Sequence, residues 1–396
     1  MKLSKKISQI EASDLAKVSR MAKEYEARGI KVIHLERGEP DFDMPRFIAE
    51  SIYRAMLDGK THYPPLQGEK TLLEALAEKV RKKNGIEAGV ENIAIVLGGM
   101  HGLYVALRTI LDPGDEVLVF TPYWLSISKL IGLADGSCSF MPFYIPLMEG
   151  WLSETDFEKQ LDETITPRTR VIYVNTPNNP SGAVVPRSYL EALARKAVER
   201  DLIVLSDEAY EDIVFDNHRH FSISSIPGML DRTVTCFAFS KSYAMTGLRL
   251  GYLVGPKDFI QLAWSRMILY TTNGIPAPIQ VGAVAALRQG DKDIERMRRA
   301  YEERRDIFVQ ELRKVKGLRT LMPQGAFYVF ADVSALLNGG SIYDLIRDWL
   351  EVGVAVAPGM AFGAEYAGWV RFSTASSMEE LVTAARALQK RYGTNI

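Results

Sequence analysis

Four short polar segments that could carry chemistry each follow an apolar run of strand length. They are residues 98–102 (GGMHG), 175–182 (NTPNNPSG), 207–210 (DEAY) and 240–249 (SKSYAMTGLR). In an open α/β sheet a ligand lies beyond the carboxyl ends of the strands, so these segments would meet at one edge of the sheet. The first segment leads into a helical pattern, where glycines and free N–H groups suit an anion.

Together these segments hold a lysine, a carboxylate and a serine with an arginine: Lys241, Asp207, Ser240 and Arg249. Taken singly, each has an ordinary structural interpretation. A carboxylate at a strand end commonly caps the next helix, and a single lysine is usually a solvated surface charge. Their conjunction beside an anion cradle is what pyridoxal phosphate requires, so we expect a site for that cofactor.

The middle of the chain alternates apolar runs with helical patterns. The runs are Ile93–Leu97, Glu116–Phe120, Arg170–Val174, Leu202–Ser206, Thr233–Phe239 and Leu250–Val254. Several lack polar alternation, which is typical of strands buried on both faces. Apolar residues at spacings of three and four predict helices at His101–Leu111 and Ser188–Arg200. We therefore expect an α/β fold with a mostly parallel central sheet and right-handed crossovers.

The two ends of the chain differ from the middle. Their patterns are helical at residues 13–29 and Lys292–Val315, and strand-like at Ala326–Phe330 and Trp369–Phe372. We expect a large α/β domain that binds the cofactor over residues 48–285. Residues 1–47 and 286–396 would together form a smaller α+β domain.

The composition argues against several classes of protein. The chain has 396 residues, with 48 Lys+Arg against 49 Asp+Glu, so its charge does not favour binding to nucleic acid or anionic lipid. Its 2 cysteines cannot build a disulfide framework or a thiolate zinc site. Only His218 and His220 lie close together among the 5 histidines, and we expect both on a solvated loop without a metal.

No segment predicts secretion or membrane insertion. The basic N-terminal stretch lacks the apolar core of a signal peptide, and no apolar run approaches the ~18 residues of a membrane span. We therefore expect a cytoplasmic protein. Because histidine and cysteine are scarce, an enzyme of this composition would draw on lysine, carboxylates or a borrowed cofactor.

Residues 240–249 resemble the cofactor-attachment signature of the class I/II aminotransferases, which have fold type I. Residues 175–182 and 206–210 are similar to two further motifs of that family. Residues 38–42 (GEPDF) resemble its aspartate aminotransferase-like subgroup. The resemblance runs nearly end to end in order and spacing, and it implies a pyridoxal-phosphate-dependent enzyme of amino-acid metabolism.

The resemblance implies roles around the cofactor. Lys241 would form a Schiff base with the cofactor aldehyde and then carry a proton between the substrate α-carbon and the cofactor. Asp207 would keep the pyridine nitrogen protonated, and Tyr210 and Asn179 would hydrogen-bond the phenolic oxygen of the ring. The phosphate would be held by Gly99, Met100, Ser240 and Arg249.

The resemblance also implies substrate contacts. Trp124 would stack on the pyridine ring, and Trp124 and Asn179 would both face the substrate. Arg371 would clamp the α-carboxylate, since a planar guanidinium suits a bidentate carboxylate, and Gly38 would lie beside the same group. Tyr63 would reach the phosphate of a neighbouring subunit, which implies a homodimer with shared active sites.

Three positions depart from the family pattern. Ala238 stands where many relatives have a serine near the phosphate, and Met100 stands where some aspartate-specific relatives have a lysine. Arg37 falls where relatives usually have a small or apolar residue. Arg37 could bind a distal substrate carboxylate, or it could be an ordinary surface arginine.

These observations predict an aminotransferase. An L-amino acid (aspartate, aromatic or similar) would donate its amine in a ping-pong reaction, and a 2-oxo acid such as 2-oxoglutarate would collect it. A pyridoxal-phosphate lyase or oxidase is the alternative, because fold and cofactor do not dictate the reaction. A ligand-sensing regulator is a further alternative, although such proteins usually carry a DNA-binding segment for which the N-terminal residues are too few.

Overall fold

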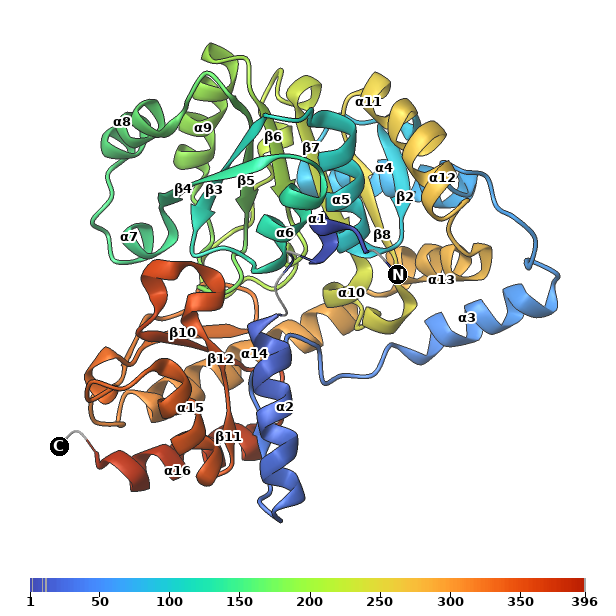
Figure 1. The fold of residues 1–396 in the computed structure, drawn as a ribbon. Coiled ribbons are helices and arrows are strands. Elements are labelled where there is room, and N and C mark those ends of the chain that lie inside the picture. Colours follow the sequence, from blue (N-terminus) through green and yellow to red (C-terminus); the bar gives the residue numbers. More distant parts are fainter. Residues whose placement is uncertain (2, 9, 11–12, 395–396) are drawn as a thin grey trace.

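A seven-stranded sheet forms the centre of the larger part of the molecule in the computed structural model, which describes residues 1, 3–8, 10 and 13–394 (Figure 1). Its strands, in spatial order, are β2 (Ile93–Val96), β8 (Gly251–Val254), β7 (Thr233–Ala238), β6 (Ile203–Asp207), β5 (Thr169–Asn175), β3 (Glu116–Thr121) and β4 (Ser137–Pro142). All pairs from β7 to β4 are parallel, whereas β8 runs antiparallel to both of its neighbours. The predicted α/β fold with a mostly parallel sheet is confirmed.

The sheet is buried on both faces, as the continuous apolar runs predicted. Every residue of β2, β3 and β8 is buried. Strand β4 was not predicted; it lies at the edge of the sheet and has mainly exposed or half-buried residues. Its sequence SCSFMP therefore needs no apolar run.

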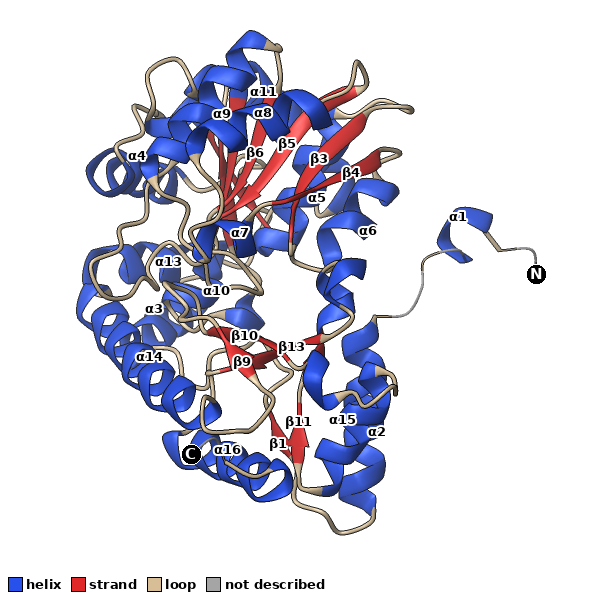
Figure 2. Cartoon of the chain, turned by 90° about the vertical axis from the view of Figure 1, so that its left-hand side faces the viewer, coloured by secondary structure: helices blue, strands red, loops and turns tan. Residues whose placement is uncertain are grey.

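Helices cover both faces of the sheet (Figure 2). One face packs against α5 (Gly98–Ile110), α6 (Ser126–Leu133) and the segment around α11 (Lys257–Leu262) and α12 (Leu269–Thr271). The other packs against α3 (Arg46–Leu57), α4 (Lys70–Asn84), α7 (Tyr144–Met148), α8 (Glu154–Thr164), α9 (Arg187–Glu199) and α13 (Ala277–Gln289). Successive residues of β3 divide accordingly, since Val117 and Val119 face α5 while Leu118 and Phe120 face α8 and α9.

Both ends of the chain contribute to the smaller part of the molecule. It contains α2 (Asp14–Ala27), β1 (Ile33–His34), α14 (Asp291–Leu312), β9 (Arg319–Thr320), β10 (Tyr328–Asp332), α15 (Ile342–Glu351), β11 (Val354–Ala355), β12 (Ala357–Pro358), β13 (Trp369–Ser373) and α16 (Met378–Tyr392). A four-stranded antiparallel sheet in the order β12, β13, β10, β9 is joined by a parallel pair of β1 and β11.

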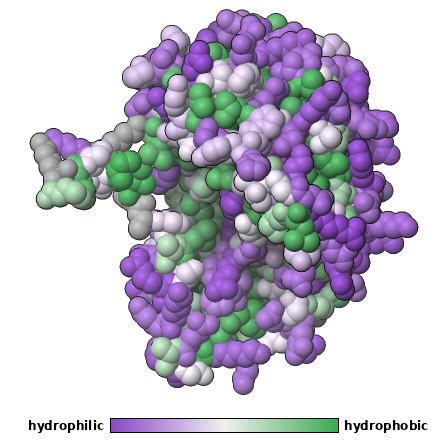
Figure 3. Space-filling model, turned by 90° about the vertical axis from the view of Figure 1, so that its right-hand side faces the viewer, coloured by the Kyte–Doolittle hydropathy of each residue, from purple (hydrophilic) through white to green (hydrophobic). Residues whose placement is uncertain are grey.

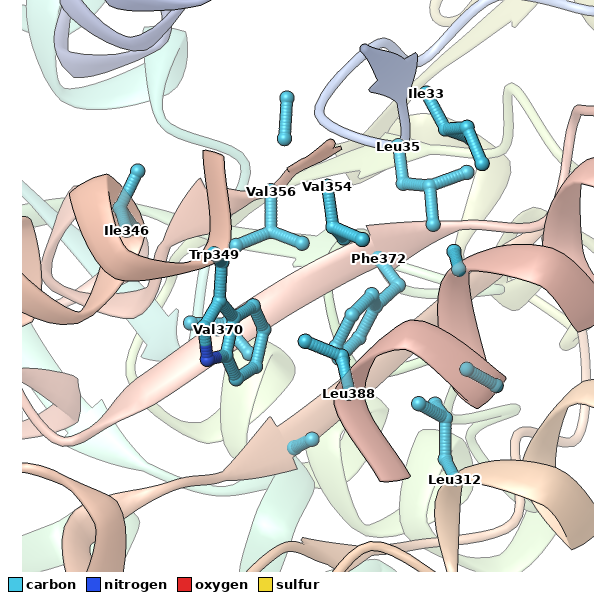
Figure 4. Packing of buried hydrophobic residues seen from close by; sticks show 14 of the residues in the cluster. Ile33, Leu35, Leu312, Ile346, Trp349, Val354, Val356, Val370, Phe372 and Leu388 are labelled. Atoms are coloured by element: carbon cyan, nitrogen blue, oxygen red, sulfur yellow. The ribbon is translucent and has the colours of Figure 1, made fainter. Parts of the chain in front are cut away.

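One apolar cluster unites these two ends. Leu35 packs in the same cluster as Trp349, Phe372 and Leu388, and Trp349 stacks on Phe372 with ring centroids 5.7 Å apart (Figure 4). The domain boundaries at residues 47/48 and 285/286 stay a prediction. No helix of the described residues is long and apolar enough to cross a membrane.

Gly251, the first residue of β8, lets the start of α5 approach the sheet closely. A Cβ atom there would lie 2.7 Å from the carbonyl oxygen of Phe237 and 3.1 Å from the backbone of Gly98. These are main-chain atoms held by the sheet and the helix, so they cannot move aside cheaply. Gly251 therefore fixes where the N-terminus of α5 lies.

We expect Gly251→Ala to lower the free energy of unfolding by about 1–3 kcal/mol, because the added methyl group overpacks this contact. Denaturant unfolding measures the change. Gly132→Ala is the matched control: a Cβ at this position in α6 meets nothing within 4 Å, and alanine should stabilise the helix by up to about 1 kcal/mol. Equal stability of the two variants would contradict the prediction.

Candidate active site

A cavity of about 390 Å³ lies at the carboxyl ends of the parallel strands, against the smaller part of the molecule. Figure 3 shows the surface hollowed between the two parts. Of the residues predicted for the site, the cavity is lined by Gly38, Gly99, Met100, Trp124, Asn179, Asp207, Tyr210, Ser240, Lys241, Arg249 and Arg371. It is also lined by residues for which no site role was predicted, among them Leu15, Glu39, Leu125, Thr246 and Tyr328.

Lys241 lies on α10 (Phe239–Ser242), the short helix that follows β7. Its Nζ donates a hydrogen bond of 2.7 Å to the carbonyl oxygen of Gly38. The pKa of this amine is lowered to about 8: burial is the main cause, Arg371 and Arg249 act in the same direction, and Glu39 and Asp207 act against it. A lysine amine that is neutral over more of the physiological pH range is a better nucleophile and base.

Asp207 is the last residue of β6, so its side chain emerges at the sheet edge beside Lys241. Burial raises the pKa of the carboxyl group to about 6. The Tyr173 hydroxyl, which donates to Oδ2 at 2.8 Å from the neighbouring strand β5, acts in the opposite direction. The carboxylate is therefore the main form at neutral pH, although the group is buried.

The start of α5 forms an anion cradle with Arg249. Gly98 is the first helical residue and has a φ of +79°, and a Cβ there would lie 2.8 Å from Nη2 of Arg249. The helix thus begins at the first glycine, earlier than the predicted start at His101. Free N–H groups at the helix start, the Arg249 guanidinium and the hydroxyl-bearing Ser240 all border the cavity, an arrangement suited to a phosphate.

Arg371 is buried on β13 and has no carboxylate partner among the described residues. Nη1 donates to Oδ1 of Asn179 at 3.0 Å, and Nη2 donates to the carbonyl oxygen of Glu36 at 2.6 Å. Nε is buried without a hydrogen-bond partner. Because a buried, unpaired guanidinium is costly, this one is expected to meet an anionic ligand.

Asparagine side chains organise the turn that carries Asn179. Oδ1 of Asn175 accepts a hydrogen bond from the Asn179 backbone at 2.8 Å, and Nδ2 of Asn175 donates to the carbonyl oxygen of Asp207 at 3.0 Å. The Asn178 Oδ1 accepts from Ser181. The turn is thereby fixed to the end of β6, and Asn179 and Asp207 line the same cavity.

Tyr210 and Tyr328 both line the cavity and meet there. Their hydroxyl oxygens are 2.8 Å apart, and both residues are buried. No role was predicted for Tyr328 or for Tyr173. Each lies within an aromatic and apolar strand, so its residue type is also that of a core residue and gives no separate signal.

Two predicted site residues lie outside the cavity in the described chain. Tyr63 is 85% exposed. The Arg37 side chain is 58% exposed, with Nε 3.5 Å from Oε1 of Glu36. Their roles toward a neighbouring subunit and a distal carboxylate stay predictions.

The expectation of a solvated loop for His218 and His220 is wrong for the second histidine. The His220 side chain is only 8% exposed, and its Nε2 lies 2.7 Å from Oε2 of Glu208. Glu208 is fully buried and also accepts hydrogen bonds from the Ser206 and Ser222 hydroxyls. A buried carboxylate needs these partners, and they draw His220 inward.

Comparisons with known proteins agree with this arrangement. The profile of the family "Aminotransferase class I and II" matches residues 30–388. The chain is 38% identical over 397 residues to a probable aspartate/prephenate aminotransferase of Aquifex aeolicus, with 98% of each chain covered. It is 38% identical to the aspartate/prephenate aminotransferase of Thermus thermophilus, with 96% of each covered. The solved aspartate aminotransferase from Thermus thermophilus with maleate has a TM-score of 0.91 and 36% identity, covering 98% of this chain and 99% of that one.

We expect the Lys241 amine to react with a small acylating reagent in a pH profile with its midpoint near 8, because burial lowers its pKa. Competitive labelling followed by mass spectrometry measures the profile for each lysine. Lys196 is an internal control, since its hydrogen bond to Asp162 raises its pKa above the ordinary lysine value. Parallel profiles for the two lysines would contradict the prediction.

Proposed function

The chain belongs to the class I and II aminotransferases, and from this premise we propose that its cavity binds pyridoxal phosphate and transfers the amine of an L-amino acid to a 2-oxo acid. One observation carries the proposal. A buried amine of lowered pKa, a buried carboxylate and a buried arginine without a carboxylate partner line the same cavity: Lys241, Asp207 and Arg371.

The residues present fit this cofactor. Gly99, Met100, Ser240 and Arg249 would hold the phosphate, and the space that a Cβ on Gly98 would fill lies against the Arg249 guanidinium. Asp207 would face the pyridine nitrogen, Tyr210 and Asn179 the phenolic oxygen, and Trp124 the ring. When bound, pyridoxal phosphate supplies an electron-withdrawing ring that stabilises negative charge on the substrate α-carbon.

Lys241 would act as both the attachment point and the proton carrier. With a pKa of about 8, its amine can accept a proton from the substrate α-carbon and return it at neutral pH. The carbonyl oxygen of Gly38 accepts a hydrogen bond of 2.7 Å from this amine and holds it in the cavity. The bound ligand would replace the carbonyl as the partner of the amine. Asp207 remains ionised above about pH 6, where it can stabilise a positive charge on the pyridine nitrogen.

Arg371 would bind the α-carboxylate of the substrate. Asn179 and the Glu36 carbonyl each accept one hydrogen bond from its guanidinium, and Nε has no hydrogen-bond partner. A fixed planar fork aligns a carboxylate better than a flexible ammonium group does.

The donors that we propose are aspartate, aromatic or similar amino acids, with 2-oxoglutarate as an acceptor. Support comes from relatives named aspartate/prephenate aminotransferase and from an aromatic-amino-acid aminotransferase of Thermococcus litoralis that is 38% identical to the chain.

We further propose a homodimer in which Tyr63 reaches the neighbouring site. Its 85% exposure leaves it available for such a contact. A cytoplasmic location stays a prediction.

With the cofactor bound and an amino acid as the only substrate, we expect the reaction to stop after one amine per subunit. The amine then stays with the enzyme until a 2-oxo acid collects it. Quantifying the 2-oxo acid released from aspartate, phenylalanine or tyrosine measures this stoichiometry. Lys241→Ala should slow the release of the 2-oxo acid at least about 100-fold. Continuous release of ammonia would instead identify the lyase or oxidase alternative.

We expect Arg371→Lys to lower kcat/KM for amino-acid donors about 10- to 100-fold, because lysine cannot reproduce the bidentate contact. Steady-state kinetics at several donor concentrations measure the loss. Arg319→Lys is the control, since Arg319 is half exposed and pairs with Glu149 and Asp332 outside the cavity. An unchanged kcat/KM in Arg371→Lys would remove this arginine from substrate binding.

A further inference from the structure

Tyr328 contacts three of the groups on which the proposed reaction depends. It is the first residue of β10, in the smaller part of the molecule, and it is only 2% exposed. Its hydroxyl lies 2.8 Å from that of Tyr210, which follows β6 of the large sheet. Tyr328 therefore spans from one part of the molecule to the other at the cavity.

The ring of Tyr328 supports the guanidinium of Arg371. The Arg371 Cζ lies 4.3 Å from the centre of the Tyr328 ring, within the range of a cation–π contact. The register explains this contact, because Tyr328 pairs with Ser373 on the antiparallel strand β13, and Arg371 is two residues along the same strand. Residues at this diagonal offset project from the same face of a sheet.

The hydroxyl of Tyr328 also packs against Gly38. A Cβ on Gly38 would lie 2.4 Å from the Tyr328 oxygen, so no other residue fits there without displacing the tyrosine. The carbonyl oxygen of Gly38 in turn accepts the hydrogen bond from Lys241. Tyr328 thus also sets the position of the backbone that holds the lysine amine.

The number of hydroxyl hydrogens in the Tyr210–Tyr328 pair limits which of the two can donate into the cavity. Within the described chain, neither hydroxyl has a second hydrogen-bond partner. Each hydroxyl has one hydrogen, so Tyr210 can donate into the cavity only when Tyr328 donates to the Tyr210 oxygen. A hydroxyl that accepts one hydrogen bond donates a stronger one, because the bonds polarise each other.

We propose that Tyr328 is a positioning residue, whose hydroxyl directs the Tyr210 proton toward the phenolic oxygen of bound pyridoxal phosphate and whose ring supports Arg371. This inference rests on the proposed function. It assigns separate tasks to the two ends of one side chain. The hydroxyl acts on the cofactor side through Tyr210, and the ring acts on the substrate side through Arg371.

The hydroxyl is tested with Tyr328→Phe, which keeps the ring. The phenolic oxygen loses part of its stabilisation as an anion, so the pH midpoint of the absorbance change of the bound cofactor should rise by about 0.4–1 unit. Tyr210→Phe should shift the midpoint further in the same direction. The double variant should match Tyr210→Phe alone, since Tyr328 acts through Tyr210.

The ring is tested with Tyr328→Leu. We expect KM for amino-acid donors to rise about 3- to 10-fold in this variant but to stay near the wild-type value in Tyr328→Phe, which keeps the cation–π contact. Tyr301→Phe is the matched control, because Tyr301 is a fully buried neighbouring tyrosine whose hydroxyl has no partner. Removal of the Tyr301 hydroxyl should leave both the pH midpoint of the cofactor absorbance and KM unchanged.

An unshifted midpoint in Tyr328→Phe, or a shift that adds to that of Tyr210→Phe, would overturn the role of the hydroxyl. An unchanged KM in Tyr328→Leu would overturn the role of the ring. If the wild-type protein binds the cofactor and transaminates but the Tyr328 variants behave like Tyr301→Phe, the role of Tyr328 is refuted and the proposed function stands. A wild-type protein that does neither refutes the proposed function itself.

Discussion

Burying a charged group that forms no salt bridge is costly, and among the described residues the cavity does so with Lys241, Asp207 and Arg371. The hydrogen-bond partners of these three groups are neutral: backbone carbonyls of Gly38 and Glu36, the Asn179 amide oxygen and the Tyr173 hydroxyl. Such partners stabilise a charge only in part, and the pKa of Lys241 and that of Asp207 both move toward neutrality. An ionic ligand can offset the free-energy cost that remains, so the cavity suits a charged ligand.

The two parts of the molecule divide this task between them. The strand ends of the large sheet supply Lys241 and Asp207, while Arg371 comes from β13 of the smaller part. Residues 36–38, near the start of the chain, contribute the carbonyl groups that hold both cations. The cavity is therefore complete only when segments from the beginning, middle and end of the chain are packed together.

The sequence predicted the large sheet and the residues at its strand ends because both follow from local patterns. An apolar run followed by a polar turn locates Lys241 and Asp207 without any knowledge of distant contacts. Arg371 was assigned only through resemblance to a family, since nothing local separates it from other strand arginines. Tyr173, Tyr328 and the edge strand β4 escaped prediction because an aromatic in an apolar strand, or a polar edge strand, has no distinctive pattern. The inward position of His220 depends on Glu208, a partner that sequence spacing does not show.

The reversed direction of β8 brings Lys241 and Arg249, the proposed cofactor anchors, close together along the chain. β7 ends and β8 begins at the same edge of the sheet, with Ala238 opposite Gly251, so the chain leaves and returns within residues 239–250. Lys241 and Arg249 both lie on this short excursion. A parallel β8 would begin at the opposite edge of the sheet, so the connection would have to run back along the full length of the strands. Here the separation between the amine and the guanidinium is set by local chain closure, at small entropic cost.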